Sequence, residues 1–342
     1  MSPTVTVLIP NYNGSLYLAH CLDSLFSQTN QNFLCHFLDD GSTDRSLEIA
    51  QQYQPLIPAM TVHAFPRGGI AANWNRGMRL VKTKYFAILH CDDSYAPDYL
   101  RTMVDLMDSH PQSGIGHCAV QAIDSESKAF FSFVEFYKNS VFLPREKFER
   151  ELKNEFSLLL KGNFINCPSV IYRTEAAKNI GEFDESLVQT LDWSYWFRTL
   201  LAGYKICATN RKLYYYRRHS NNVTLQNAEN LTRYREELQC LRSAHGAAQF
   251  ACYVKEEISY VGLQQILLVD FSAALRQGKR EFSKKLIEFL RVEIKAKPYV
   301  IYALRGLLAI GKAGGMILYL LIWIAVFFTA AKKMIMRAVF SK

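Results

Sequence analysis

The sequence predicts an α/β protein in which a mainly parallel central sheet is flanked by helices and followed by a helical C-terminal region. Segments with the patterns of strands and helices alternate over the first hundred residues, and this alternation is typical of parallel strands joined by right-handed crossovers. Hydrophobic residues make up 49% and charged residues 21% of the 342 residues. That composition suits a buried core, excludes a disordered or fibrous protein, and at this length fits about two domains.

Short runs of apolar and β-branched residues mark the expected strands, and apolar residues at helical spacing mark the expected helices. Strands are expected over Thr4 to Pro10, Phe33 to Leu38, Met60 to Phe65, Tyr85 to His90, Phe164 to Arg173 and Lys212 to His219. Helices are expected around Leu18 to Phe26, Leu47 to Tyr53, Ile70 to Lys82, Leu100 to Met107, Asp192 to Ala202, and throughout residues 225 to 295. The aromatic and charged run from 130 to 152 suits a flexible segment over an open cleft.

Three polar loops follow strands of the first half: PNYN, DDGSTD and HCDDS. Ligands of parallel α/β sheets bind beyond the carboxyl ends of the strands, so we expect these loops to meet at one edge of the sheet. Acidic side chains gathered in a cleft repel one another unless a cation is present. Asp92 and Asp93, directly after a buried strand, are therefore expected to hold Mg²⁺ or Mn²⁺ through carboxylate oxygens, with positions left for substrate phosphates.

The net charge of +9 comes almost entirely from the C-terminal end of the chain. Residues 291 to 342 hold nine basic residues and one acidic residue, a charge of +8 that leaves +1 for everything before them. This distribution argues against nucleic acid as a partner and predicts contact with an anionic membrane lipid surface. Residues 313 to 331 are nineteen positions without charge, and 299 to 312 have the pattern of an interfacial amphipathic helix. Crossing the bilayer and lying in its surface stay open alternatives, because basic residues flank the apolar run on both sides.

Cysteine usage and the N-terminal residues predict a cytosolic location for the first domain. The eight cysteines are scattered singly with no C-x-x-C pair, which argues against a zinc site or a disulfide framework and favours a reducing compartment. The chain enters a strand pattern at once, without the charged and apolar regions of an export signal.

Several motifs, taken in order, give the chain a resemblance to the family 2 glycosyltransferases, which are inverting enzymes with the GT-A fold. The motifs are PNYNG with LxxCLDSLxxQT, LDDGSTD, NWNRG leading into YFAILHCDD, GEFDE followed by LDWSYWFR, and YRRH, over roughly residues 4 to 220. With the tail, the resemblance divides the chain into a GT-A domain over 1–222, a helical region over 223–297 and a membrane-associating tail over 298–342. The GT-A domain would have a nucleotide-binding half to about residue 95 and an acceptor half from about residue 96.

The resemblance also implies roles for individual residues. Binding of a nucleotide sugar would involve Pro10, Tyr12, Asn13, Asp39, Asp40, Asn73, Asp92 and Arg217. Asp92 with Asp93 would coordinate Mn²⁺ or Mg²⁺ on the diphosphate, and His219 would approach the metal from the far side. Asp192 would be the catalytic base. Because Asp is also a preferred helix N-cap, a purely structural role for Asp192 stays open.

Two positions depart from the common pattern of the family. His90 stands in the first acidic position of the metal motif, and Leu191 replaces the Glu that commonly precedes the base. His90 either hydrogen-bonds the ribose or diphosphate or simply ends the strand. Leu191 removes one hydrogen-bonding group from the acceptor site. Trp193 and Trp196, at their spacing, are expected in the core.

The function predicted is metal-dependent, inverting transfer of a sugar from a nucleotide diphosphate sugar, with UDP as the expected nucleotide. The acceptor is a hydroxyl of a glycan or polyprenyl-linked molecule, at the cytoplasmic face of the plasma membrane and in surface polysaccharide synthesis. Two alternatives are an enzyme that forms nucleotide sugars and an inactive membrane-bound binding protein. The first is disfavoured because PNYNGS has one glycine and no basic residue to hold a triphosphate. The second is disfavoured because Asp40, Asp92, Asp192 and His219 are all present.

Overall fold

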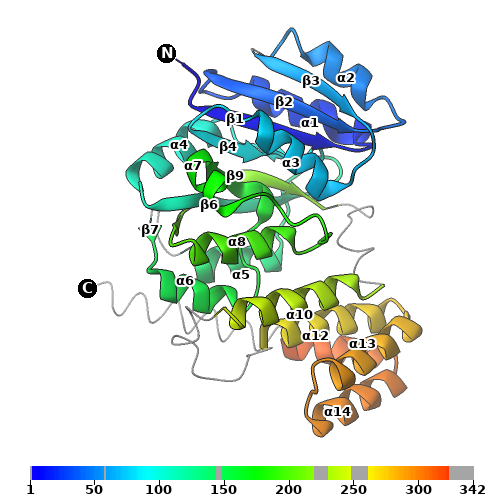
Figure 1. Cartoon of the computed structure of the whole chain (residues 1–342). Coiled ribbons are helices and arrows are strands. Elements are labelled where there is room, and N and C mark those ends of the chain that lie inside the picture. The colour runs from blue at the N-terminus through cyan, green and yellow to red at the C-terminus, as the bar shows by residue number, and fades with distance from the viewer. Residues whose placement is uncertain (1, 58, 144–147, 219–229, 248–260, 323–342) are drawn as a thin grey trace. The chain divides into compact units, whose positions relative to one another are not determined.

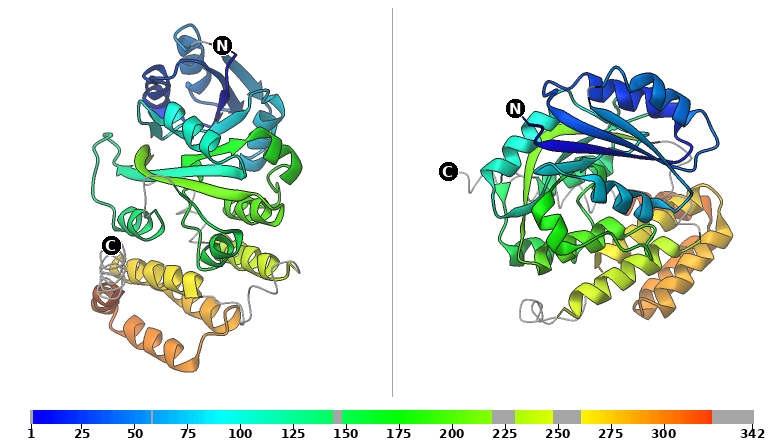
Figure 2. Two further views of the ribbon diagram at one scale, coloured as in Figure 1. Left: turned by 90° about the vertical axis from the view of Figure 1, so that its left-hand side faces the viewer. Right: turned by 45° about the horizontal axis from the view of Figure 1, so that its top comes forward.

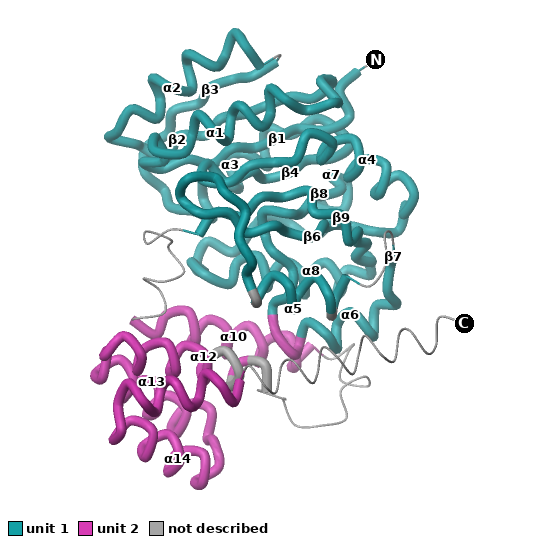
Figure 3. Tube along the Cα trace, turned by 180° about the vertical axis from the view of Figure 1, so that it is seen from behind, with its two compact units in different colours: residues 1–159, 163–222 teal, residues 160–162, 223–342 magenta. Residues whose placement is uncertain are grey.

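A computed structural model describes residues 2–57, 59–143, 148–218, 230–247 and 261–322. The contacts within the chain define two compact units, shown in Figure 3. The first unit comprises residues 1–159 and 163–222, and the second comprises residues 160–162 and 223–342.

The first unit contains one sheet with the strand order β3-β2-β1-β4-β8-β6-β9-β5, and β7 also pairs with β9. Its first four strands are parallel, as predicted, and run over Val5–Asn11 (β1), Phe33–Asp40 (β2), Met60–Phe65 (β3) and Tyr85–Ile88 (β4). In the register of β1 and β2, Asn11 lies beside Asp39. The polar loops after β1, β2 and β4 therefore start from one edge of the sheet.

The second half of the sheet is mixed, and there the prediction of a mainly parallel sheet is wrong. The remaining strands are β5 (Ser94–Tyr95), β6 (Ser113–Ile123), β7 (Phe148–Glu149), β8 (Val170–Arg173) and β9 (Lys205–Arg217). Strand β8 lies antiparallel to both β4 and β6, whereas β6 and β9 are parallel. The short strands β5 and β7 are antiparallel to β9. Strand β8 lies between β4 and β6 and runs in the opposite direction to both. The rule that successive strands are parallel and joined by right-handed crossovers therefore does not describe the sheet beyond β4.

Helices cover both faces of the parallel strands (Figure 1; Figure 2). The helices of the first half are α1 (Ser15–Phe26), α2 (Ser46–Tyr53), α3 (Ile70–Leu80) and α4 (Tyr99–Ser109). Buried residues of α1 and α4 share one core with Val5 and Val7 of β1. Helix α3 packs on the opposite face, where a Cβ on Gly77 would come within 2.5 Å of the side chain of Leu38. Each of these helices was expected from apolar spacing.

The segment from 130 to 152, which was expected to be flexible, has regular secondary structure over most of its described residues, and its flexibility stays a prediction. It contains α5 (Phe133–Phe142) and β7, followed by α6 (Leu152–Leu159), while residues 144–147 lie outside the described part. Ser132 caps α5 by accepting a hydrogen bond from the backbone N–H of Glu135. The Asn139 side chain bonds both the N–H and the carbonyl of Val120 and so fastens α5 to β6. Helices α7 (Thr174–Ile180) and α8 (Leu191–Leu201) complete the first unit.

The second unit is helical throughout its described residues. Its helices are α10 (Thr232–His245), α12 (Val261–Arg276), α13 (Arg280–Val292) and α14 (Pro298–Ala309), and residues 312–322 are also helical. This confirms the helical prediction for the described residues of 225 to 295. Only residues 313–322 of the apolar run are described, and the rest of it lies outside the described part. Among the described residues, every helix is too short or too polar to cross a membrane.

Candidate functional site

Three side chains that could ligate a metal follow strand β4. The ligand atoms of His90, Asp92 and Asp93 all lie within 4.8 Å of one another. Asp93 is buried, and its carboxylate accepts hydrogen bonds from the Tyr214 hydroxyl and from the backbone N–H of Arg217, both at 2.7 Å. Asp92 and His90 are partly exposed and line the open side of the group. We call these three residues the metal group.

The electrostatics of the metal group fit a divalent cation. Burial, and then the charge of Asp92, raise the pKa of Asp93 well above its ordinary value. Burial lowers the pKa of His90, which keeps its imidazole neutral and able to ligate. A cation would offset the repulsion between the two carboxylates. One imidazole with two carboxylates is a donor set that suits Mn²⁺ and is less typical of Mg²⁺, which prefers oxygen.

Arg217 fastens the turn of the metal group to the rest of the first unit. Its side chain is fully buried and donates from Nε to the carbonyl of Asp92 and from Nη1 to the carbonyl of Asp124, both at 2.7 Å. Its Nη2 lies 3.1 Å from Nδ1 of His20. In the structure these contacts of the guanidinium are all to the protein itself, and the role in diphosphate binding that the resemblance implies stays a prediction. His219, the other far-side residue, lies outside the described residues.

The two aspartates that end β2 have different partners. Asp39 is buried and accepts hydrogen bonds from the Asn11 side chain and the backbone N–H of Ser42, both at 2.9 Å. Asp40 is also buried and accepts from the side chains of Arg67 and Arg76, each at 2.9 Å. Two further bonds at 2.7 and 2.8 Å come to Asp40 from the backbone N–H groups of Gly68 and Gly69. The Asp40 carboxylate therefore fixes the loop that precedes α3.

Tyr12 offers an exposed ring beside this loop. Its exposed fraction is 46%, and the guanidinium carbon of Arg67 lies 3.2 Å from the ring centroid. Arg67 thus joins Tyr12 to Asp40. Asn13 has a left-handed backbone (φ 52°), and its side chain accepts from the N–H of Thr43 at 2.8 Å, which ties the loop after β1 to the loop after β2. Pro10 is partly buried in β1.

The asparagines of the NWNRG motif position backbone segments. Asn73, predicted to bind the nucleotide sugar, is buried and donates to the carbonyl of Leu38 at 2.8 Å. Asn75 bonds both backbone groups of Phe183, at 2.9 and 3.0 Å, and thereby holds the GEFDE loop against α3. Asn75 belongs to the NWNRG motif, but its contact with Phe183 could not be predicted, because more than a hundred residues separate the two in sequence.

Asp192 lies buried at the start of α8, in the second half of the sheet domain. Burial raises the pKa of Asp192 to about 6, opposed by hydrogen bonds from the backbone N–H of Trp193 at 2.6 Å and from Asn163 at 3.1 Å. The charge of Lys138 also lowers it. A carboxylate with this pKa is ionised at neutral pH and can accept a proton readily.

A chain of aromatic rings connects the metal group to the helix that carries Asp192. Trp74 contacts His90 with ring centroids 5.5 Å apart and contacts Phe183 at 5.0 Å. Phe183 in turn contacts Tyr195 of α8 at 4.5 Å. These ring contacts connect the metal group to α8, the helix that begins with Leu191 and Asp192.

Four polar residues around Asp192 were missed by the sequence analysis: Glu135, Lys138, Asn163 and Asn166. Glu135 and Lys138 of α5 both bond the Asn166 side chain at 2.8 Å. They lie in the segment that was interpreted as flexible, so no periodic pattern assigned them to a face. Single asparagines in a loop carry no distinguishing sequence signal of their own.

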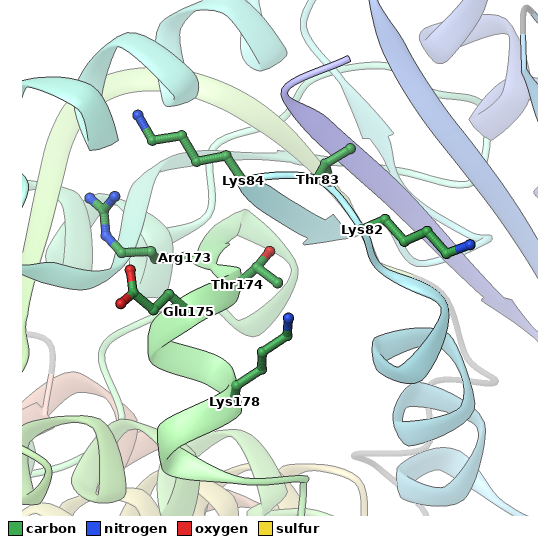
Figure 4. A pocket seen from close by; sticks show the side chains of 7 residues that line it. All are labelled: Lys82, Thr83, Lys84, Arg173, Thr174, Glu175 and Lys178. Carbon is green, nitrogen blue, oxygen red and sulfur yellow. The ribbon is translucent and has the colours of Figure 1, made fainter. Parts of the chain in front are cut away.

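A cavity of about 340 Å³ lies elsewhere in the first unit (Figure 4). Its lining residues are Lys82, Thr83, Lys84, Arg173, Thr174, Glu175 and Lys178. Residues 82–84 precede β4, whereas the metal group follows it. This cavity is therefore at the opposite end of that strand and is not part of the candidate site.

Comparison with known proteins identifies the protein family of this chain. The sequence model of the family described as "Glycosyl transferase family 2" matches residues 6–181, just over half of the chain. The chain therefore belongs to glycosyl transferase family 2, the family of the resemblance. An uncharacterized glycosyltransferase of Rickettsia typhi is 30% identical over 200 residues, which are 58% of this chain and 59% of that protein. The chain thus spans somewhat under two thirds of the length of this relative.

Three further proteins are informative because their names or complexes state a substrate. The UDP-Glc:alpha-D-GlcNAc-diphosphoundecaprenol beta-1,3-glucosyltransferase WfaP of Escherichia coli is 24% identical over 67% of this chain and 83% of that protein. The structure of TarS 1–349 of S. aureus in complex with UDP-GlcNAc is similar with a TM-score of 0.59 and 20% identity, over 93% of this chain and 89% of that one. PcManGT of Pyrobaculum calidifontis, in complex with GDP-Man and Mn²⁺, gives a TM-score of 0.52 at 15% identity, over 100% of this chain and 88% of that one. The two structures show that the fold is GT-A.

Proposed function

We propose that this protein transfers a sugar, with inversion, from a nucleotide diphosphate sugar to a hydroxyl group, and that the reaction depends on a divalent metal. The observation that carries the proposal is the pairing of two sites in one unit. The metal group follows β4, and a buried carboxylate with its pKa raised to about 6 begins α8. Ring contacts from His90 through Trp74 and Phe183 to Tyr195 of α8 support this pairing.

The chain's own residues divide the work of donor binding. Tyr12, which is exposed, offers a ring on which a nucleobase can stack, and Asp40 keeps the loop beside it in place. Asp92 and Asp93 with His90 would hold Mn²⁺ or Mg²⁺. A cation there stabilises the negative charge that develops on the leaving diphosphate. UDP is the proposed nucleotide, supported by the UDP-GlcNAc complex of TarS and the UDP-Glc named for WfaP.

Asp192 would act as the base toward the acceptor. An acceptor hydroxyl must lose its proton as it attacks the sugar carbon, and a carboxylate within hydrogen-bond reach can take that proton. Asn163 donates to Oδ2 of Asp192 and fixes the orientation of the carboxylate. Attack from this side, opposite the leaving group, inverts the configuration of the sugar carbon.

We propose further that the protein works at the cytoplasmic face of a membrane, on a lipid-linked acceptor of surface polysaccharide synthesis. The acceptor named for WfaP supports the acceptor class. Residues 299–321 support the location, because this part of the second unit exposes large apolar side chains: Tyr299, Tyr302, Ile310, Met316, Ile317, Leu320 and Leu321. Tyrosines with flanking basic residues are typical of surfaces that lie in a membrane interface.

Two experiments test these proposals separately. Purified full-length protein is incubated with a panel of nucleotide sugars and Mn²⁺, and release of the nucleotide is measured with and without excess chelator. At least one nucleotide sugar should release its nucleotide only when the metal is available. Equal nucleotide release in excess chelator would contradict metal dependence. For the location, sedimentation with anionic vesicles should fall when Tyr299 and Tyr302 are both changed to Ser, and should not change in Val269→Ser. Equal sedimentation of all variants would remove the membrane proposal.

A further inference from the structure

The first turn of α5 and the residues before it expose an unusual amount of apolar surface. Its members, which we call the α5 surface, are Phe130, Phe131, Val134 and Phe136, with exposed fractions of 38%, 66%, 47% and 41%. The rings of Phe131 and Phe136 contact each other with centroids 5.5 Å apart. A helix on the outside of a soluble domain normally turns its polar residues to solvent, so a clustered apolar face here indicates a binding partner.

In its first turns, the side of the same helix that faces the protein carries polar residues. Glu135 is buried and Asn139 bonds the backbone of β6. Glu135 accepts a hydrogen bond from Asn166 at 2.8 Å, and Lys138 donates to the same side chain at 2.8 Å. In the first two turns of α5, polar side chains therefore face the protein while the α5 surface faces solvent.

The polar side of α5 leads directly to Asp192. Asn163, three residues before Asn166, donates to the Asp192 carboxylate, and the Lys138 charge lowers the pKa of Asp192. The α5 surface and the candidate base are thus linked through the inner side of α5 and the segment from Asn163 to Asn166. A molecule that reaches Asp192 past α5 would lie against this apolar surface.

Two cationic side chains lie on or beside α5. Arg218 pairs with Glu135 at 3.0 Å, and its side chain is 43% exposed. Lys138 is partly exposed on the neighbouring turn. An amphiphile with an anionic head would match this combination of exposed apolar side chains and neighbouring cations. The chemistry that fits is a sugar linked through a diphosphate to a hydrocarbon chain.

We infer that the α5 surface binds the first hydrocarbon segment of a lipid diphosphate acceptor, with its diphosphate near Arg218 and Lys138 and its sugar at Asp192. This inference rests on the proposed function, whose acceptor it specifies. An anionic bilayer fits less well, because the exposed carboxylate of Glu126 lies in the turn just before the surface and is compensated only by Lys128. The exposed apolar area comes from only four side chains. An area of this size fits a short hydrocarbon segment better than the surface of a membrane.

The test uses farnesyl diphosphate as the probe, below its micelle concentration. Binding to the full-length protein is measured by calorimetry in excess chelator, so that the diphosphate does not bind through a metal at His90, Asp92 and Asp93. Changing Phe131 and Phe136 to Ser should weaken binding at least tenfold. Phe26→Ser and Leu56→Ser remove side chains that are 56% and 53% exposed elsewhere in the first unit and should have no effect.

Three results would overturn the inference. One is unchanged farnesyl diphosphate binding in the double variant. Another is an equal loss of inorganic pyrophosphate binding, which would mean that the diphosphate and not the hydrocarbon is affected. The third is a loss of sedimentation with anionic vesicles while farnesyl diphosphate binding persists, which would assign the surface to the bilayer. Metal-dependent hydrolysis of the donor should persist in the double variant, so failure of the inference is distinguishable from failure of the proposed function.

Discussion

The backbone N–H of Arg217 donates to Oδ1 of Asp93 at 2.7 Å, while the Arg217 side chain binds the main chain of Asp92 at the same distance. The last residue of β9 therefore holds both aspartates that follow β4, although 124 residues separate Arg217 from Asp93 in sequence. The geometry of the metal group depends on a residue that is itself fully buried.

Replacing Arg217 by Met should therefore destabilise the protein and disturb the metal group together. The change leaves the carbonyls of Asp92 and Asp124 without their donor, and we expect a loss of at least about 3 kcal/mol in the free energy of unfolding. Urea unfolding checks the stability. Arg45→Met removes an exposed arginine paired only with Glu48 and should cost less than about 1 kcal/mol. Similar losses in both variants would contradict the positioning role of Arg217.

Asp92→Asn should weaken Mn²⁺ binding at least tenfold without unfolding the protein, because Asp92 is the more exposed carboxylate of the metal group. His90→Ala should also weaken it, since the imidazole is one of three ligands within reach. Free Mn²⁺ is followed by its electron paramagnetic resonance signal. Asp105→Asn, on the exposed side of α4, is the matched control. If His90→Ala binds Mn²⁺ as tightly as the unchanged protein, His90 is not a ligand.

Turnover should rise with pH through about 6 and then level, because Asp192 must be ionised to accept a proton and its pKa is raised to about 6. Asp192→Asn should lower turnover by roughly a hundredfold or more, remove this pH dependence and leave donor affinity nearly unchanged. Steady-state rates and donor binding by calorimetry separate the two effects. A collapse of donor binding with normal turnover of bound donor would place Asp192 in the donor site.

The same substitution should stabilise the protein near neutral pH. The folded-state pKa of Asp192 lies above the unfolded value, so its contribution to stability is complete below about pH 4 and is lost as the pH rises through about 6. Asn carries no charge at any pH. Asp192→Asn should thus be more stable than the unchanged protein by up to about 3 kcal/mol at pH 7.5, with little difference at pH 4. Equal stability at both pH values would contradict the buried-charge account.

The sequence predicted the parts of this fold that depend on local pattern. The parallel strands β1 to β4 and helices α1 to α4 follow from apolar runs and helical spacing, and the place of Asp92 and Asp93 after β4 made them candidate metal ligands. His90 was expected to bond the ribose or diphosphate or simply to end the strand, and its place among the possible ligands comes from the structure. Strand β6 was missed because Gly114, Gly116 and His117 interrupt its apolar run. A Cβ on Gly116 would lie 2.9 Å from the sulfur of Met107. Close packing, and not strand propensity, therefore explains why glycine occupies this position.

The partners of single polar residues could not be predicted. Arg217 was expected to face a diphosphate, and only the folded chain brings its donors to the carbonyls of Asp92 and Asp124. The same holds for Asn163 beside Asp192, because a hydrogen bond across 29 residues leaves no periodic trace in the sequence.

The central claim is that the metal group and Asp192 serve one transfer reaction. The most direct measurement is NMR of the product formed from an α-linked UDP-sugar and a hydroxyl acceptor with Mn²⁺, for the unchanged protein, Asp92→Asn and Asp192→Asn. The account predicts a β-linked product from the unchanged protein and at least a hundredfold less from each variant, with UDP binding in chelator unaffected by Asp192→Asn. An α-linked product, or a full yield from either variant, would contradict it.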